Sequence, residues 1–460
     1  MFLSSGVLMK NPKISVYIPS HNYGKYLEIA IESVLLQTTD NWELLIIDDN
    51  SKDNTPEIIN MYKGDERIRT FFVPGIGLPA VCNLALRESK GKYIIRLDGD
   101  DFFEENILLV LSNYLERNAE CAMVFPDYYL INEYGEIFAH EKREKIFVNN
   151  HVFDTPANGA CSLIRKSVLQ KIGGYREDIG AQDGFDLWNK LVGHYKIGNI
   201  NLPLFFYRQH GKNLTQQSHH ILSARRRIKS DNIIKKVEKY RPIIAVIPCR
   251  KNYDFYPDVW QRKLMGKTLL EINIEKCIQS RTFDYIVVAS DNPDVKDILS
   301  QFDDHRLMYF TRKSEETIRS LNLTPTLERI VQTIDPECKG LTVLSYLQAP
   351  FFSIETLEES FCTLILNDAD CAFGVEEIQD PVYKRTPLGF MTLNPSRGLS
   401  SDFDILYKES NISLSTKNTN ILKGSLTGPQ IVNFVVSPDE CFFINSEQKL
   451  KIAEILLGQK

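Results

Sequence analysis

The sequence lacks any apolar run near the roughly 20 residues that a helix needs to cross a bilayer. It also lacks an excess of basic charge, because 60 Asp and Glu residues outweigh 54 Lys and Arg residues and give a formal net charge of −6. We therefore expect no general affinity for nucleic acid. The nine cysteines are scattered, odd in number and without a CxxC pair, which favours reduced thiols in a reducing compartment.

The start of the chain carries no clear export signal. Met1–Met9 has a short apolar patch, but no basic start and no convincing cleavage site. We interpret residues 1–11 as a disordered leader, with Met9 as an alternative start of translation. These features favour a cytoplasmic protein with at most peripheral contact at the inner face of a membrane.

The two halves of the chain show the same order of predicted strands and helices. With 460 residues, two or three domains are expected. Each half begins with a β-branched run ending in proline, followed by a helical stretch and a second strand. These segments are Ile14–Pro19, Tyr26–Gln37 and Glu43–Asp49 in the first half, and Ile243–Pro248, Thr268–Ser280 and Tyr285–Asp291 in the second. Strand, helix and strand form a βαβ unit, so the sequence predicts an α/β fold of two tandem Rossmann-like domains.

The join between the halves is rich in Arg and Lys and nearly free of Gly and Ser, which favours a helical connector over residues 223–241. The predicted domains are therefore residues 12–222 and 242–460. Within the connector, Arg225–Arg227 and Lys229 are interpreted as a solvated helix face. Contact with anionic lipid or a phosphorylated acceptor is the alternative.

Polar loops follow three predicted strands of the first half. Pro19–Tyr23 follows the first, Asp48–Ser51 the second, and Asp98–Asp101 the strand Tyr93–Leu97. Ligands of open α/β sheets bind at the carboxyl ends of the strands, so these loops should meet. A buried carboxylate cluster repels itself unless a cation or protons neutralise it, and its oxygens suit Mg²⁺ or Mn²⁺. Taken alone, Asp98–Asp101 would also serve as turn residues.

Several motifs of residues 12–218 resemble the family 2 glycosyltransferases of GT-A fold. The matching segments, in the family's order and spacing, are Ile14–Asn22, Leu45–Asn54, Leu97–Asp101, Asn158–Arg176, Gln182–Trp188, Tyr207–His210 and Asn213–Thr215. Several independent motifs in the correct order are far more specific than any one of them. The QxxRW motif of processive relatives is absent, which favours a transferase that adds a single sugar.

The resemblance implies roles on the donor side of the site. Pro19, His21 and Asn22 would line the nucleotide pocket. Asp49 would contact the base, most often uracil. Asp98 would lie near the ribose and diphosphate of a nucleotide-sugar, with a UDP-sugar as the expected donor.

It also implies a metal and a base. Asp100 would hold Mg²⁺ or Mn²⁺, Asp101 could share that role, and His210 would help to hold the diphosphate or the metal. Asp183 would deprotonate the hydroxyl of a glycan or lipid-linked acceptor, because a sugar hydroxyl is a poor nucleophile until a base takes its proton. The family commonly has Glu before this Asp, where the present chain has Gln182. A helix N-cap is the alternative role of Asp183.

Residues 242–460 resemble the cytidylyltransferases that make CMP-sialic acid or CMP-Kdo. Residues that could contact a second nucleotide are Arg250, Lys263, Lys267 and Gln348. However, bulky residues replace the expected glycines in Lys251–Gln261, and the expected Asp-x-Asp metal pair is replaced by Phe443 and Asn445. We therefore expect a degenerate domain. If the dimers of relatives persist, the chain forms a homodimer through this half.

These features predict an inverting, metal-dependent glycosyltransferase of surface polysaccharide or glycoconjugate biosynthesis. Two alternatives remain. The second half could make a CMP-activated sialic-acid-like or Kdo-like sugar, so that the chain is bifunctional. The chain could also be a scaffold that binds nucleotide-sugar without turnover.

Overall fold

The computed structural model describes residues 11–142, 159–179, 182–192, 194–210, 218–251, 256–317, 323–378, 380–394 and 406–458. Residues 1–10 of the predicted leader and the Asn213–Thr215 motif lie outside the described residues. The chain divides into two compact units, the first of residues 1–217 with 395–403 and the second of residues 218–394 with 404–460. Both are α/β units, so the predicted fold class is confirmed.

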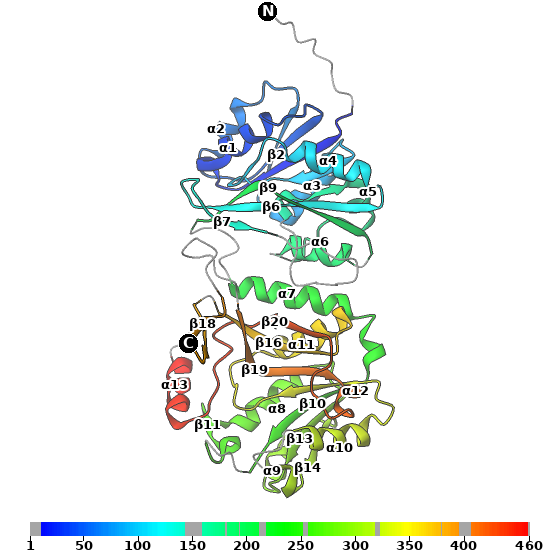
Figure 1. Cartoon of the computed structure of the whole chain (residues 1–460), viewed down its shortest axis with the longest axis vertical. Helices are drawn as coiled ribbons and strands as arrows, with labels where there is room; N and C mark the ends of the chain where they lie inside the picture. Colours follow the sequence, from blue (N-terminus) through cyan, green and yellow to red (C-terminus); the bar gives the residue numbers. More distant parts are fainter. Residues whose placement is uncertain are drawn as a thin grey trace, which may run out of the picture. The chain divides into compact units, whose positions relative to one another are not determined.

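Among the described residues, the first unit is built on a nine-stranded mixed sheet of order β3-β2-β1-β4-β8-β6-β9-β5, with β7 paired to β6 (Figure 1). Its strands are β1 (Ile14–Ser20), β2 (Trp42–Asp49), β3 (Ile68–Val73), β4 (Tyr93–Arg96), β5 (Phe102–Phe103), β6 (Cys121–Ile131), β7 (Ile137–Glu141), β8 (Leu163–Arg165) and β9 (Lys196–Arg208). Its helices are α1 (Gly24–Leu35), α2 (Thr55–Met61), α3 (Leu78–Glu88), α4 (Ile107–Arg117), α5 (Lys166–Lys171) and α6 (Asp183–Leu191).

The sheet has a core on each face, because successive side chains of a strand point to opposite sides. In β1, Val16 and Ile18 pack with α1, α2 and α4, whereas Tyr17 packs on the other face with α3, α5 and α6. Both β1 and β2 are buried along their whole length, as expected for parallel strands covered on both faces.

The parallel register of the central strands positions the candidate site. Ser20 pairs with Asp48 across β1 and β2, and Tyr17 pairs with Arg96 across β1 and β4. The loops that follow these three strands therefore start at the same edge of the sheet. Because the strands are apolar and the loops polar, the sequence itself marks this edge.

The described part of the second unit contains a seven-stranded mixed sheet of order β14-β13-β10-β15-β19-β16-β20 and two small hairpins, β11–β12 and β17–β18. Its strands are β10 (Ile243–Cys249), β11 (Lys263–Leu264), β12 (Lys267–Thr268), β13 (Tyr285–Ser290), β14 (Leu307–Thr311), β15 (Leu341–Ser345), β16 (Cys371–Ile378), β17 (Tyr383–Thr386), β18 (Gly389–Thr392), β19 (Leu406–Lys417) and β20 (Ile431–Val435). Its helices are α7 (Ser218–Ile233), α8 (Leu269–Gln279), α9 (Val295–Leu299), α10 (Thr324–Ile334), α11 (Ile354–Asn367), α12 (Asn418–Ile421) and α13 (Glu447–Gly458).

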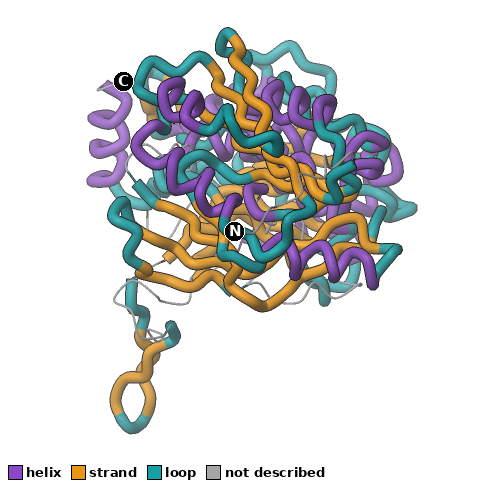
Figure 2. The backbone as a smooth tube through the Cα atoms, turned by 90° about the horizontal axis from the view of Figure 1, so that it is seen from above, coloured by secondary structure: helices purple, strands orange, loops and turns teal. Residues whose placement is uncertain are grey.

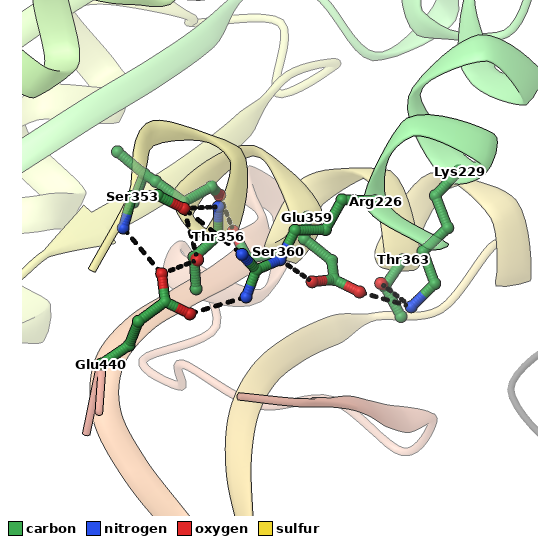
Figure 3. A network of polar contacts seen from close by, with 9 residues as sticks. Arg226, Lys229, Ser353, Thr356, Glu359, Ser360, Thr363 and Glu440 are labelled. Atoms are coloured by element: carbon green, nitrogen blue, oxygen red, sulfur yellow. Dashed lines mark hydrogen bonds and ion pairs between the residues drawn. The ribbon is translucent and has the colours of Figure 1, made fainter. Parts of the chain in front are cut away.

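Helix α7, which falls largely within the predicted connector, packs on α11 as part of the second unit. Lys229 is 2% exposed and Arg226 9% exposed, so the prediction of a solvated basic face is wrong for these two residues. Glu359 of α11 lies between them, 2.9 Å from the Lys229 ammonium and 3.0 Å from Arg226 Nε (Figure 3). Arg226 also contacts Glu440 at 2.7 Å. Local sequence could not reveal this cluster, because the acids come from distant segments.

Replacing Glu359 with Gln should destabilise the second unit by about 3 kcal/mol or more, because it removes the buried carboxylate that pairs with both Arg226 and Lys229. Denaturant unfolding of the whole chain measures this change. Glu355→Gln is the matched control, since Glu355 lies on the exposed side of the same helix. Equal midpoints for the two variants would contradict the role of the cluster.

The β17–β18 hairpin stands out from the second unit (Figure 2). Its large apolar side chains are strongly exposed, including Tyr383 at 61%, Leu388 at 101% and Phe390 at 75%. An isolated two-stranded hairpin is only marginally stable in water, so this one needs a covering surface.

Across the described residues, no helix combines the length and hydropathy that crossing a membrane requires.

Candidate functional site

The loop after β1 is tied to the loop after β2. Nδ1 of His21 donates a hydrogen bond to the carbonyl oxygen of Asp49 at 2.6 Å. The side-chain oxygen of Asn22 accepts from the amide of Lys52 at 2.7 Å. Asn22 has a φ of 61°, a left-handed conformation that asparagine tolerates. Pro19 lies in β1, so Pro19, His21 and Asn22 all belong to the same sheet edge.

The Asp49 carboxylate holds the loop that follows β3. Its Oδ1 accepts from the amide of Ile76 at 2.7 Å, and its Oδ2 accepts from the amide of Gly77 at 2.8 Å. Gly75 and Gly77 both have a φ of 85°, which favours glycine at these positions. The side chain predicted to contact a nucleotide base therefore also orders a second loop.

The Asp98–Asp101 loop packs closely against the first loop. A Cβ added to Gly99 would lie 3.4 Å from Tyr23 Cβ and 3.5 Å from the carbonyl oxygen of Pro19. Glycine at this position thus lets the acidic loop approach the end of β1. The predicted convergence of these two loops is a feature of the structure.

His210 and Arg208, at the end of β9, contact the acidic loop. His210 Nε2 lies 3.0 Å from Asp100 Oδ2, and its ring stacks on Tyr26 with the centroids 5.5 Å apart. The amide of Arg208 donates to Asp101 Oδ1 at 2.7 Å, and its Nε donates to the Asp100 carbonyl oxygen at 2.8 Å. Three side chains predicted for a metal site therefore lie together.

The surroundings of the three carboxyl groups in this loop disfavour their ionised forms. Burial raises the pKa of Asp98 to about 6, against the attraction of Arg96 and with the repulsion of Asp100. Burial also raises the pKa of Asp100, although the His210 contact opposes this shift. For Asp101, burial and then repulsion by Asp100 and Asp98 raise the pKa well above its usual range. Such a cluster is stabilised by protons or by a cation.

A single guanidinium joins Asp98 to Asp183. Arg96 Nε lies 3.0 Å from Asp98 Oδ1, and Nη2 lies 3.3 Å from Asp98 Oδ2. Nη1 of Arg96 donates to Asp183 Oδ2. Helix α6 begins at Asp183, directly after Gln182 in a left-handed conformation. The Asp183 side chain thus contacts β4 and is not the N-cap of α6.

The candidate residues of the second unit serve other contacts. The Lys267 ammonium lies 2.7 Å from Glu275, and Lys263 is exposed in β11. Gln348 is 5% exposed, and its backbone carbonyl oxygen accepts from the backbone amide of Ile444 at 2.8 Å. Arg250 follows β10.

Aromatic packing occupies the segment in which a metal pair was expected. The rings of Phe351 and Phe442 lie 5.5 Å apart, whereas Asn445 is exposed. The bulky stretch Lys251–Gln261 is described only in part, because residues 252–255 lie outside the described residues. The degeneracy of this nucleotide site stays a prediction.

Comparison with known families assigns the two parts of the chain. Residues 15–173 match the model of glycosyl transferase family 2, and residues 261–388 match the cytidylyltransferase model. The first unit carries a family 2 glycosyltransferase domain. The second carries a cytidylyltransferase-like domain, so both resemblances inferred from the sequence are confirmed.

Curated relatives of the glycosyltransferase domain include proteins of polysaccharide synthesis. An uncharacterised glycosyltransferase of Rickettsia felis is 32% identical over 202 residues, which are 43% of this chain and 33% of the relative. Chondroitin synthase of Escherichia coli is 26% identical over 258 residues, 54% of this chain and 37% of the relative. A putative teichuronic acid biosynthesis glycosyltransferase of Bacillus subtilis, TuaG, is 37% identical over 127 residues, 27% of this chain and 50% of the relative. The chain spans about a third of the length of the first curated relatives.

The side chains of the glycosyltransferase domain fit a divalent cation that is shared with a substrate. Asp101 Oδ2 is buried without a hydrogen-bond partner, and Asp100 and His210 offer an oxygen and a nitrogen at one place. Within the described residues, no group of three or more His, Cys, Asp or Glu side chains is arranged to hold a metal by itself. Mg²⁺ commonly takes one or two carboxylates and completes its shell with phosphate oxygens and water.

Sequence reasoning missed Arg96 and Arg208 of the glycosyltransferase domain. Both are buried, at 8% and 2% exposure. For Arg96, the available signal was an arginine at the end of an otherwise apolar strand, which requires a buried partner. For Arg96, the partner Asp183 is 87 residues away, so the sequence alone could not identify the pair.

Proposed function

We propose that the glycosyltransferase domain moves a sugar from a nucleotide-sugar, most simply a UDP-sugar, to a glycan or lipid-linked acceptor in surface polysaccharide or glycoconjugate biosynthesis. The observation that carries this proposal is that the predicted diphosphate or metal ligand His210 and the predicted base Asp183 both lie beside one acidic loop. Asp98–Asp101 contacts His210 on one side and Asp183, through Arg96, on the other. A donor-binding side and an acceptor base thus lie next to each other.

The chemistry requires one base and one leaving group. Asp183 takes the proton of the acceptor hydroxyl, the acceptor oxygen forms a bond to the anomeric carbon, and the bond from that carbon to the diphosphate breaks. Because this is a single displacement, the anomeric centre inverts. No second carboxylate has to act as a covalent nucleophile.

Asp100 and His210 would hold Mg²⁺ or Mn²⁺, with Asp101 beside them. The bound cation would neutralise charge on the leaving diphosphate. Pro19, His21 and Asn22 would line the nucleotide pocket, and Asp49 would contact the base; His21 and Asn22 are already tied to the loop after β2. The support for these assignments is that the same sheet edge presents all of them.

Nucleotide binding tests the proposal on the whole chain. UDP with Mn²⁺ at about 100 times its dissociation constant should raise the melting temperature of the first unit by about 5 to 10 °C. CTP with Mg²⁺ should cause no comparable shift. The Asp100→Ala variant should lose the Mn²⁺-dependent part of the UDP shift.

The two alternatives make different predictions in the same experiment. If CTP or CMP alone stabilised the chain, and CTP with sialic acid or Kdo released pyrophosphate, the bifunctional enzyme would take first place. The second unit would then use Arg250, Lys263, Lys267 and Gln348. If UDP bound and no UDP-sugar was ever consumed, the chain would be a scaffold.

We also propose that the second unit forms a homodimer through the β17–β18 hairpin. Helix α13 of the same unit offers a second apolar surface, with Ile455 at 60% and Ile452 at 46% exposure. Two unsatisfied apolar surfaces on one chain suit an isologous pair. A cytoplasmic location, with at most peripheral contact at the inner face of a membrane, is part of the same proposal, because lipid-linked acceptors are presented there.

Replacing both Leu388 and Phe390 with Asp should convert a dimer into a monomer in sedimentation experiments, because charge would have to be buried at the interface. Ile234→Asp is the control, since Ile234 is another strongly exposed apolar residue of the same unit, at 66%, and lies outside the hairpin. A wild-type chain that is monomeric at tens of micromolar would refute the dimer. A variant that remains dimeric would place the interface elsewhere.

A further inference from the structure

The guanidinium group of Arg96 contacts two carboxylates that have different roles in the proposed reaction. Its Nε and Nη2 face the two oxygens of Asp98, at 3.0 and 3.3 Å, and its Nη1 donates to Asp183. The side chains are buried, with 9% exposure for Arg96 and 11% for Asp183. This planar fork matches arginine, whereas a lysine ammonium could approach only one of the two acids closely.

The contact leaves one oxygen of Asp183 available. Arg96 engages Oδ2, and among the described residues no hydrogen bond or ion pair involves Oδ1. Gln182, in its left-handed conformation, starts α6 so that Asp183 faces Arg96 and does not cap the helix. The orientation of the free oxygen is therefore set by the guanidinium.

One glycine packs beside this guanidinium and against a second glycine. A Cβ added to Gly159 would lie 3.3 Å from Arg96 Nη2 and 3.7 Å from the Cα of Gly184. Gly184 is the second residue of α6, directly after Asp183. The glycines let the start of α6 approach β4 closely enough for the contact between Arg96 and Asp183.

We infer that Arg96 is a positioning residue. Arg96 holds the Asp183 carboxylate so that Oδ1 takes the acceptor proton. The same guanidinium links this base to the donor-side carboxylate of Asp98. This inference rests on the proposed glycosyl transfer. In the step it supports, the proton moves from the acceptor oxygen to Oδ1, the acceptor oxygen bonds to the anomeric carbon, and the diphosphate leaves. Arg96 touches neither substrate and acts only through the two acids.

The test compares Arg96→Lys with Arg165→Lys in the full-length chain. Arg165 is a matched control, because it also makes several hydrogen bonds, to the carbonyl oxygens of Leu115, Cys121 and Asn118, and none to the candidate site. UDP release from a panel of UDP-hexoses with Mn²⁺ measures turnover, and thermal shift with UDP measures binding. We expect Arg96→Lys to lower kcat by about 10²-fold, since a displacement of about 1 Å can cost that much, and to change UDP affinity by less than about threefold.

A double-mutant cycle separates positioning from a general structural role. If Arg96 acts through Asp183, then Arg96→Lys should add little loss to Asp183→Asn. Arg165→Lys should lower the melting temperature and keep kcat within about twofold. Equal kcat losses for the two lysine variants, additive losses in the cycle, or UDP binding lost as much as turnover would overturn the inference. A wild-type chain that consumes no UDP-sugar would instead refute the proposed function, and the positioning role with it.

Discussion

Asp183→Asn should lower turnover by at least about 10²-fold and leave UDP binding unchanged, because an amide cannot take the proton of the acceptor hydroxyl. The Asp183 side chain is 11% exposed and contacts Arg96, and no nucleotide-pocket residue bonds to it within the described segments. The substitution keeps the shape of the side chain. A defect in chemistry without a defect in donor binding is therefore the expected result, measured as kcat and as the dissociation constant for UDP with Mn²⁺.

Asp186→Asn is the matched control for this change. Asp186 lies one helical turn further along α6, is 2% exposed, and pairs with Lys190 at 2.7 Å. The control variant loses a buried charge of the same helix and should keep its turnover. Loss of UDP binding in Asp183→Asn would instead make Asp183 structural, and similar loss of activity in both variants would point to a damaged helix.

The fold was predicted from sequence where the apolar pattern is long and buried. The predicted strands Ile14–Pro19 and Tyr285–Asp291 agree with β1 and β13 to within one residue, because largely buried parallel strands leave an almost uninterrupted apolar signal. The mixed half of each sheet was not predicted. Strands β6 and β9 pair in parallel from distant positions with irregular register, and local pattern carries no information on such pairing.

The polar loops Asp48–Ser51 and Asp98–Asp101 were predicted because they follow strands, whereas Asp183 and His210 were predicted from the family resemblance. Their fixed partners were not found, since Arg96 and Arg208 meet them through long-range packing. The basic run of α7 was also interpreted without knowledge of its long-range partners. Its charge pattern indicates a solvated face, yet Arg226 and Lys229 are buried because Glu359 comes from another helix. Buried ion pairs depend on both partners, and one segment reveals only one of them.

Asp100→Ala should abolish metal-dependent turnover and leave the fold intact. Asp100 Oδ2 is the carboxylate oxygen beside His210, and an alanine offers no ligand in its place. The change should not lower the melting temperature without metal. Burial raises the pKa of Asp100 in the folded chain, so its ionised form opposes folding at neutral pH, and this penalty disappears with the carboxylate. Thermal melts and UDP release across a Mn²⁺ titration measure both effects.

Asp65→Ala is the control with the opposite expected result, because the fold stabilises Asp65 in its charged form. A hydrogen bond from the Arg67 side chain lowers the pKa of Asp65, so its ionised form favours folding above the pKa of the unfolded chain, and this contribution is lost as the pH falls through the folded value. At neutral pH this variant should lose stability and keep turnover, the opposite of the result for Asp100→Ala. If Asp100→Ala kept its full rate at saturating Mn²⁺, Asp100 would not hold the metal. If it lost its fold, the acidic loop would be structural, because its carboxylates would then stabilise the unit without any cation.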